Sequence, residues 1–282
     1  MEQFIKRRPA LIFPVLIVVW TWIFMAAFIA LVPVDPEQGP TVAHVALVFL
    51  VANPSVFGIL FTQMVGGKQG VRVLFARAVR WRVKPIWYVA SLLLIPAVYS
   101  LSYLIQGWLG TPTGPIDVVG KLTFVLPIAL TACLMEEFGW RGFALPKLLE
   151  RHSSLTAALI VGVGWALWHA PINYFALSKF GTGAIPTLIA LALGPILQSV
   201  IMTWIHNNAK ASMLLMLLAH FAITSGAIVF MVSSPTAVTE LRNNLVSVAL
   251  FVLTAAVVVV AAGAKRAGAI VLIRRNRGSL LT

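Results

Sequence analysis

Residues 120–145 read GKLTFVLPIALTACLMEEFGWRGFAL, a mostly apolar run that carries two glutamates and an arginine near its end. A membrane-spanning helix needs about 20 consecutive, predominantly apolar residues, and this run is long enough. An ionised side chain inside such a span costs roughly 2.5–3.5 kcal/mol even on lenient insertion scales. Glu136, Glu137 and Arg141 are therefore functional candidates. This stretch predicts both a transmembrane helix and the place of a site.

Seven further apolar runs have the same character. The chain is 60% hydrophobic and 10% charged, with a mean hydropathy of +0.95, whereas a soluble domain carries roughly 25% charged residues. We therefore predict an all-α, polytopic transmembrane bundle of about eight helices, with residues 1–282 forming one membrane domain. In chain order, the predicted spans cover residues 10–32, 43–65, 87–109, 120–145, 155–176, 185–205, 211–232 and 245–263.

Basic residues are distributed unevenly among the connections between these runs. If successive connections alternate sides, 18 of the 21 Lys and Arg residues fall on one side, together with both termini. An excess of Lys and Arg in short connections marks the cytoplasmic side. We therefore predict a multi-pass protein of the cytoplasmic (plasma) membrane with both termini in the cytoplasm. Membrane lipid then accounts for the net charge of +13, and nucleic acid is not expected as a partner.

The connection between the second and third runs mixes large apolar and basic side chains. Phe75 and Trp81 are interspersed with Arg77 and Arg80 among other cations. Such a mixture is typical of an amphipathic helix that lies in the interface against anionic headgroups. We predict an interfacial helix near residues 66–86, with a basic connecting loop as the alternative.

The two adjacent glutamates differ in their relation to Arg141. Glu137 is four residues from Arg141, on the same helical face, so the two can form an ion pair. Glu136 is rotated by about 100° from Glu137 and points elsewhere. A carboxyl group without an ion partner in a low-dielectric medium can exchange a proton near neutral pH, as a general base requires. The alternative is that all three residues form a structural polar cluster between helices.

The depth of Glu136 predicts where its helix ends. If the helix ended at Arg141, Glu136 would lie only about 8 Å from the helix end, at 1.5 Å per residue. It could not then meet His169, which is expected deep in the next span. We therefore predict that the helix continues to about Leu149, with a kink at Pro146.

Two histidines and a threonine extend the set of candidates. His169 lies within the fifth span, one turn after Trp165, which is expected to form a wall of the same cavity. His220 lies within the seventh span, and Thr224 follows one turn later, so both can address one point.

Two other residue types are weaker candidates. His206 is expected to be solvated in a short turn, His206-Asn207-Asn208. The single cysteine, Cys133, is expected to be a small packing residue and rules out an internal disulfide.

The motifs exclude several peptidase classes and resemble one family. The chain has no His-Glu-x-x-His zinc motif, and its only aspartates, Asp35 and Asp117, are predicted to lie outside the membrane. The ordered set Glu136-Glu137-x-x-x-Arg141, Trp165-x-x-x-His169 and a later His220 resembles the CAAX prenyl protease and bacteriocin-processing family (CPBP or ABI family).

The resemblance implies an intramembrane endopeptidase whose catalytic core covers residues 116–230. Glu136 and His169 would activate water, while His220 and an asparagine one turn later would stabilise the oxyanion. Here Thr224 stands at the asparagine position. The resemblance also implies a membrane peptide or lipidated protein as substrate. It leaves the cofactor open: none is needed, or a single divalent metal such as zinc is held by Glu136, His169 and His220.

Two other functions are compatible with the same buried residues. A catalytically weak membrane scaffold or bacteriocin-immunity protein would use the polar cavity for binding, and Thr224 supports this alternative. A proton-coupled transporter also uses buried acids and histidines. It is the weakest alternative, because the sequence has neither evident repeats nor paired interrupted spans.

Overall fold

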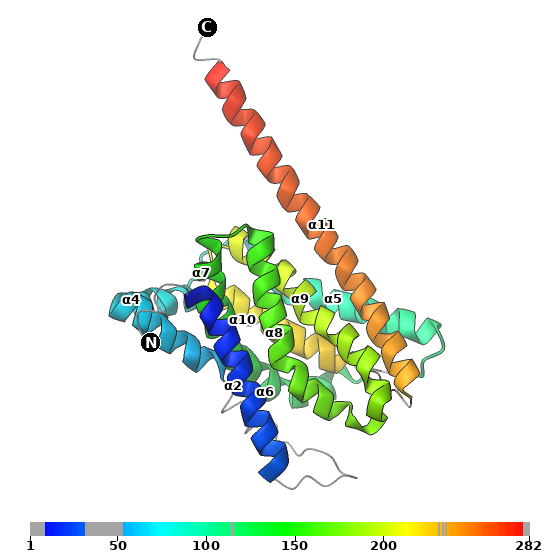
Figure 1. Ribbon diagram of the computed structural model, residues 1–282. Helices are drawn as coiled ribbons and strands as arrows, with labels where there is room; N and C mark the ends of the chain where they lie inside the picture. The colour runs from blue at the N-terminus through cyan, green and yellow to red at the C-terminus, as the bar shows by residue number, and fades with distance from the viewer. Residues whose placement is uncertain are drawn as a thin grey trace.

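The computed structural model describes residues 9–31, 53–113, 116–230, 232, 234 and 236–278, with the backbone alone from residue 264 (Figure 1). All regular secondary structure in these residues is helical, which confirms the predicted all-α class. The π-helix η1 directly follows α6, and the 3-10 helix η2 joins α8 to α9. The helices are α2 (Pro9–Leu31), α4 (Pro54–Ala78), α5 (Pro85–Trp108), α6 (Val118–Glu137), η1 (Phe138–Ala144), α7 (Leu145–Leu149), α8 (Ser154–Ala176), η2 (Ser178–Gly183), α9 (Ala184–Asn208), α10 (Met213–Val229) and α11 (Ala237–Gly278).

The helices agree with the predicted spans. Within the described residues, six segments are long and apolar enough to cross a membrane, and α10 is a shorter apolar helix. The predicted span 43–65 lies partly outside the described residues, and its remainder is the start of α4. The chain is therefore a multi-pass membrane protein with a polytopic helical fold. The cytoplasmic location of its termini remains a prediction.

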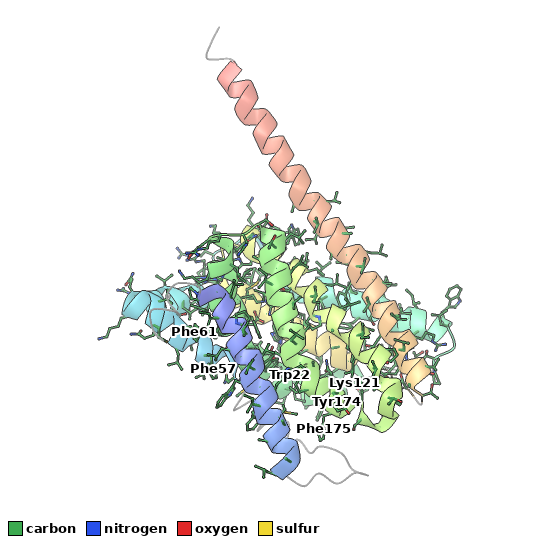
Figure 2. All side chains as sticks on the ribbon, in the orientation of Figure 1. Trp22, Phe57, Phe61, Lys121, Tyr174 and Phe175 are labelled. Carbon is green, nitrogen blue, oxygen red and sulfur yellow. The ribbon has the colours of Figure 1, made fainter. Side chains whose placement is uncertain are left out.

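The outer faces of the helices are covered with large apolar side chains (Figure 2). Ile23 on α2, Leu104 on α5, Ile189 on α9 and Val260 on α11 are each more than 60% exposed. Apolar surface of this extent is unfavourable in water but matches the hydrocarbon core of a bilayer. These faces are therefore the lipid-facing surface that the composition predicts.

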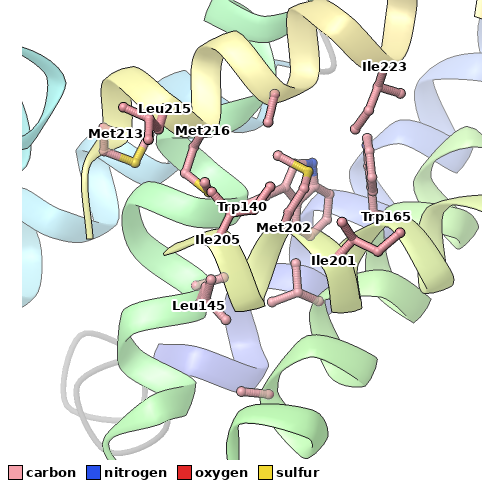
Figure 3. Close-up of a cluster of buried hydrophobic side chains, with 14 of the residues drawn as sticks. Trp140, Leu145, Trp165, Ile201, Met202, Ile205, Met213, Leu215, Met216 and Ile223 are labelled. Carbon is pink, nitrogen blue, oxygen red and sulfur yellow. The ribbon is translucent and has the colours of Figure 1, made fainter. Parts of the chain in front are cut away.

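The interior is packed with aromatic and long apolar side chains. Trp140 is fully buried near Met202, Ile205 and Met216, which come from α9 and α10 (Figure 3). Phe13 of α2 meets the Trp140 ring edge to face, with 5.6 Å between ring centroids, a favoured geometry for aromatic pairs. This packing holds α2, η1, α9 and α10 around the end of α6.

The helix that carries the glutamates continues to Leu149, as predicted. Val119–Leu149 forms one span, but its departure from α-helical geometry lies earlier than the expected kink at Pro146. The chain forms a π-helix over Phe138–Ala144, and the N–H of Leu145 donates to the Trp140 carbonyl five residues back. Pro146 has no N–H to donate, and the wider turn precedes it.

The predicted interfacial helix near residues 66–86 is shorter than expected. The helix α4 bends at Gly67, whose φ of +58° is readily adopted only by glycine, and it ends at Ala78. Residues 79–84 are not helical, and Pro85 begins α5. A residue before proline is disfavoured in the helical region, so the helix cannot simply run on into α5.

Candidate active site

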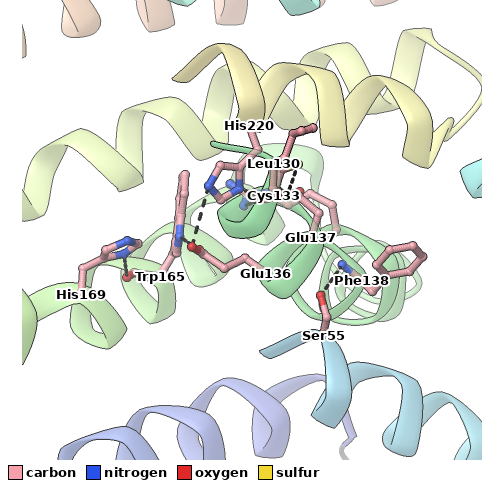
Figure 4. A network of polar contacts seen from close by, with 10 residues as sticks. Ser55, Leu130, Cys133, Glu136, Glu137, Phe138, Trp165, His169 and His220 are labelled. Atoms are coloured by element: carbon pink, nitrogen blue, oxygen red, sulfur yellow. Dashed lines mark hydrogen bonds and ion pairs between the residues drawn. The ribbon is translucent and has the colours of Figure 1, made fainter. Parts of the chain in front are cut away.

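The end of α6 brings Glu137 into contact with groups on two helices (Figure 4). Its Oε1 accepts from Arg141 Nη1 at 2.8 Å, which is the pairing that the spacing predicts. The same oxygen accepts from His220 Nδ1 of α10 at 2.7 Å. Glu137 and Arg141 are each 0% exposed, and His220 is 3% exposed. Glu137 therefore fixes both the arginine and the histidine.

Glu136 faces the opposite side of the same imidazole. Its Oε1 lies 3.8 Å from His220 Nε2, and its Oε2 accepts from the indole Nε1 of Trp165 at 2.6 Å. The carboxylate acceptor on the Nδ1 side requires a proton on Nδ1. The Nε2 atom therefore faces Glu136. The two glutamates of the pair hold one histidine from both ends.

Trp165 and Arg141 close the cluster on a third side. The guanidinium carbon of Arg141 lies 4.2 Å from the centroid of the Trp165 ring, a cation–π contact. Several buried atoms have no hydrogen-bond partner among the described residues, namely Glu137 Oε2, Arg141 Nε and Arg141 Nη2. The cluster thus retains unused donors and an unused acceptor.

His169 lies beyond Trp165 rather than in contact with the glutamates. Its Nδ1 donates to the Trp165 carbonyl at 3.0 Å; because a carbonyl only accepts, this bond leaves Nε2 without a proton in the neutral ring. The imidazole is half-buried and packs against the rings of Trp165 and Trp168. Figure 4 shows the Trp165 indole between His169 and Glu136. Within the described residues, His169 makes no hydrogen bond to Glu136 or His220.

Thr224 and Cys133 have modest environments. Thr224 is half-buried, and its hydroxyl makes no hydrogen bond within the part of the chain that the structure describes. Cys133 is buried one turn before Glu137, and its Sγ donates to the Leu130 carbonyl at 3.2 Å.

The prediction that His206 is solvated is wrong. His206 is 4% exposed and lies on the last turn of α9, which extends through Asn208. Its Nε2 is 3.0 Å from Arg77 Nη2. A cationic donor from another helix therefore provides the partner that water would otherwise supply, which spacing along the chain cannot reveal.

Arg77 is the residue that sequence reasoning missed. It is 8% exposed and contacts the end of the π-helix and the start of α10. In the sequence it is one of several cations between residues 66 and 86. Nothing in that pattern separates Arg77 from Arg80, so only the packing of α4 identifies it.

The geometry does not fit the three-ligand zinc site that the resemblance left open. Among the described residues, no group of three or more His, Cys, Asp or Glu side chains is arranged to hold a metal ion. Trp165 occupies one oxygen of Glu136 and stands between that carboxylate and His169. The described residues therefore do not form this three-ligand site.

Comparison with known proteins identifies the core of the chain. The family model of type II CAAX prenyl endopeptidases, described as Rce1-like, matches residues 117–225. A relative named CAAX prenyl protease 2, from Methanococcus maripaludis, is 29% identical over 158 residues. Residues 117–225 are thus similar to the CAAX prenyl protease family. The matched region runs from the start of α6 into α10 and contains every predicted site residue.

The CAAX prenyl protease match covers only part of each protein. The alignment with the relative covers 52% of this chain and 58% of the relative. The chain thus spans less than two thirds of the length of the curated protein that it matches. The helices α2, α4, α5 and α11 lie outside the range matched by the family model.

Proposed function

We propose that the chain is an intramembrane endopeptidase that hydrolyses a peptide bond with water activated by Glu136. The observation that carries this proposal is the buried Glu136 carboxylate, with one oxygen fixed by Trp165 and the other facing His220 Nε2 at 3.8 Å. A general base must be oriented and able to reach a water molecule. The family of the matched core supports peptidase chemistry at this place.

The reaction follows from the roles of the two glutamates. Glu136 takes a proton from water as the water oxygen forms a bond to the substrate carbonyl carbon. As the carbon–nitrogen bond breaks, the same carboxyl group returns the proton to the departing amine. Glu137 holds His220 through Nδ1. In its imidazolium form, His220 then donates from Nε2 to the oxyanion, the type of interaction that stabilises tetrahedral intermediates.

Two further side chains take supporting roles in the proposed reaction. The family resemblance assigns His169 a part in placing the water. Its Nδ1 is committed to the Trp165 carbonyl, and its Nε2 reaches a water beside Glu136 only when the Trp165 indole between them moves aside. The hydroxyl of Thr224 supplies a second, weaker donor to the oxyanion. Arg141 pairs with Glu137, which in turn accepts from His220 Nδ1 and so holds the imidazole in place.

An apolar groove supports a membrane-anchored substrate. The groove has a volume of about 410 Å³ and lies between α2, α8 and α9. It borders Ala166 and Ala170, which flank the half-buried His169 along α8, and Trp22 of α2 and Tyr174 of α8 also line it (Figure 2). A lipid chain on the substrate would occupy such a groove while the peptide reaches Glu136.

The test uses purified protein in detergent with a quenched peptide, supplied with and without a prenylated cysteine. Wild type should cleave the lipidated peptide, and Glu136→Gln and His169→Ala should not. Matched controls are Glu150→Gln and His152→Ala, which change exposed residues outside the site. Cleavage by Glu136→Gln at the wild-type rate would overturn the proposal. Binding of the peptide by wild type without cleavage would favour the scaffold or immunity alternative.

A further inference from the structure

The π-helix lies where the helical register sets the relative orientation of the two glutamates and Arg141. Phe138–Ala144 begins directly after the two glutamates and contains Arg141. A π-turn closes its hydrogen bonds one residue later than an α-turn, so it rotates the helix after it relative to the helix before it. The position of Arg141 relative to Glu137, and the direction of both glutamates, therefore depend on keeping this register.

The first support for the π-helix comes from the start of α4. The N–H of Phe138 donates to Ser55 Oγ at 3.1 Å. Gly139 lies so close to α4 that an added Cβ would clash with the Pro54 carbonyl group. Only a glycine permits this approach. One end of the π-helix is thus seated against the first turn of α4.

The second support comes from the end of α4, which provides hydrogen-bond donors to two backbone carbonyls of the π-helix. Pro146 has no N–H. An N–H at position 146 would donate to the Gly142 carbonyl in an α-helix and to the Arg141 carbonyl in a π-helix. Because proline lacks this N–H, one of the two carbonyls has no partner within the helix. Arg77 donates to both, from Nη1 to Gly142 O at 3.1 Å and from Nη2 to Arg141 O at 3.2 Å.

Arg77 has a buried guanidinium with only neutral partners. Besides the two carbonyls, it contacts Ala211 O at 2.9 Å and His206 Nε2 at 3.0 Å. Burial, with a smaller contribution from Arg80, lowers the pKa of Arg77 to about 10, so it remains a cation at neutral pH. A buried cation costs several kcal/mol unless it is well hydrogen-bonded. Four acceptors from three segments offset that cost and fix its position.

We propose that Ser55 and Arg77 are positioning residues that hold Phe138–Ala144 in its π register and thereby aim Glu136 and Glu137 at His220. The catalytic consequence rests on the proposed peptidase function. Both residues come from α4, which lies outside the range matched by the family model. The first and the last turn of α4 thus both contact the π-helix that follows the two glutamates.

The experiment compares Arg77→Gln with Arg80→Gln in the full-length protein. Arg80 is a matched control because it lies one turn further along the chain and donates to the Lys210 carbonyl, with no bond to the π-helix. In peptide cleavage, Arg77→Gln should lower kcat about 10- to 100-fold at nearly unchanged KM, as expected for misplacement of catalytic groups. Arg80→Gln should stay within about twofold of wild type in both constants.

A second readout does not depend on peptidase activity. Cys133 is the only cysteine of the chain and is buried one turn before Glu137. Its alkylation rate by a maleimide, measured well below the unfolding temperature, reports local order at this place. Arg77→Gln should raise the rate about tenfold, and Arg80→Gln should leave it unchanged.

Each result decides the inference. A folded Arg77→Gln protein with wild-type kcat, or with wild-type Cys133 alkylation, would overturn it. If Arg77→Gln does not fold, Arg77→Lys takes its place; it keeps the charge but cannot serve four acceptors, and should show smaller changes in the same direction. If wild type cleaves no peptide, the proposed function fails, and alkylation of Cys133 alone still tests whether Arg77 holds the register.

Discussion

Two of the buried polar clusters in the described part of the chain differ in how completely they are paired. One joins α5 to α11, where Asn243 donates to Ser234 Oγ and accepts from Thr111 Oγ1, and Gln106 donates to Ser102 Oγ. The other surrounds Glu137 at the end of α6. In the first cluster, no buried side-chain nitrogen or oxygen of the described residues lacks a partner; in the second, several do.

The difference fits a structural role for the first cluster and the proposed chemical role for the second. Buried polar groups in native proteins are normally hydrogen-bonded, because each unpaired group costs free energy. The α5–α11 cluster follows this rule with neutral groups and one cation, Arg242, which donates to Thr111. The Glu137 cluster contains charged groups, and it leaves Arg141 Nη2 and Glu137 Oε2 unpaired. Incomplete pairing, together with His220 held between two carboxylates, is what a site that must accept a substrate and a water molecule requires.

The largest expected effect is the loss of activity in Glu136→Gln. The amide keeps an oxygen that can accept from Trp165 but cannot take a proton from water. We expect cleavage to fall about 10²- to 10⁴-fold with a thermal unfolding temperature close to that of wild type. Glu150→Gln is the control, since Glu150 is exposed and its ion-pair partner among the described residues is Lys147, outside the site. Equal losses in both variants would contradict a specific role for Glu136.

Removal of Glu137 should mainly affect stability. Glu137→Leu leaves Arg141 and His220 buried without their shared anion, and breaking a buried pair in this way costs about 3–5 kcal/mol. The double variant Glu137→Leu/Arg141→Met removes the stranded cation and should recover a large part of that loss. Denaturant unfolding in detergent measures both. A single variant as stable as wild type would show that the pair does not stabilise the fold.

The α5–α11 cluster should respond in stability and not in activity. Asn243→Leu leaves Ser234 without its partner and removes one of the two partners of Thr111, which still accepts from Arg242. The variant should cost about 1–3 kcal/mol of unfolding free energy. Because the cluster lies outside the site, kcat of the folded protein should equal that of wild type. Steady-state cleavage at a temperature where the variant is fully folded provides the check. A fall in kcat would show that the two clusters are coupled.

The smallest expected effect is a gain. Thr224→Asn lengthens the donor that would reach the oxyanion beside His220. Loss of a complete oxyanion donor costs about 10²–10³ in rate in a well-studied protease; since Thr224 already offers one hydroxyl, we expect a rise in kcat of about tenfold. Thr239→Asn, at the exposed start of α11, is the control. An unchanged or lower kcat in Thr224→Asn would argue against an oxyanion role.

The fold was more predictable than the connections within the site. The apolar runs are longer than any buried helix needs, so span positions followed from composition and length. The i, i+4 spacing of Glu137 and Arg141 predicted their contact, because both lie on one helix. The second partner of Glu137, His220, is 83 residues away. That contact depends on how α10 is rotated against α6, which no local spacing encodes.

The errors have the same origin. His206 seemed to belong to a solvated turn because its neighbours in the chain are polar, and its buried partner, Arg77, comes from α4. The distortion expected at Pro146 occurs instead over Phe138–Ala144, where α4 supplies an acceptor at one end and donors at the other. In each case a helix distant in sequence overrode a local preference.

Composition, run length and the order of short motifs predicted that this protein lies in a lipid bilayer, that it is helical, and which family its core resembles. These are properties of single segments. An apolar segment in a bilayer must satisfy its backbone hydrogen bonds within itself, so it forms a helix whichever helices pack beside it. The partners of each buried charge became known only from the packed helices. A hydrogen bond needs its two atoms about 3 Å apart, and in this bundle that closeness arises from rotations and close approaches between α4, α6, α8 and α10.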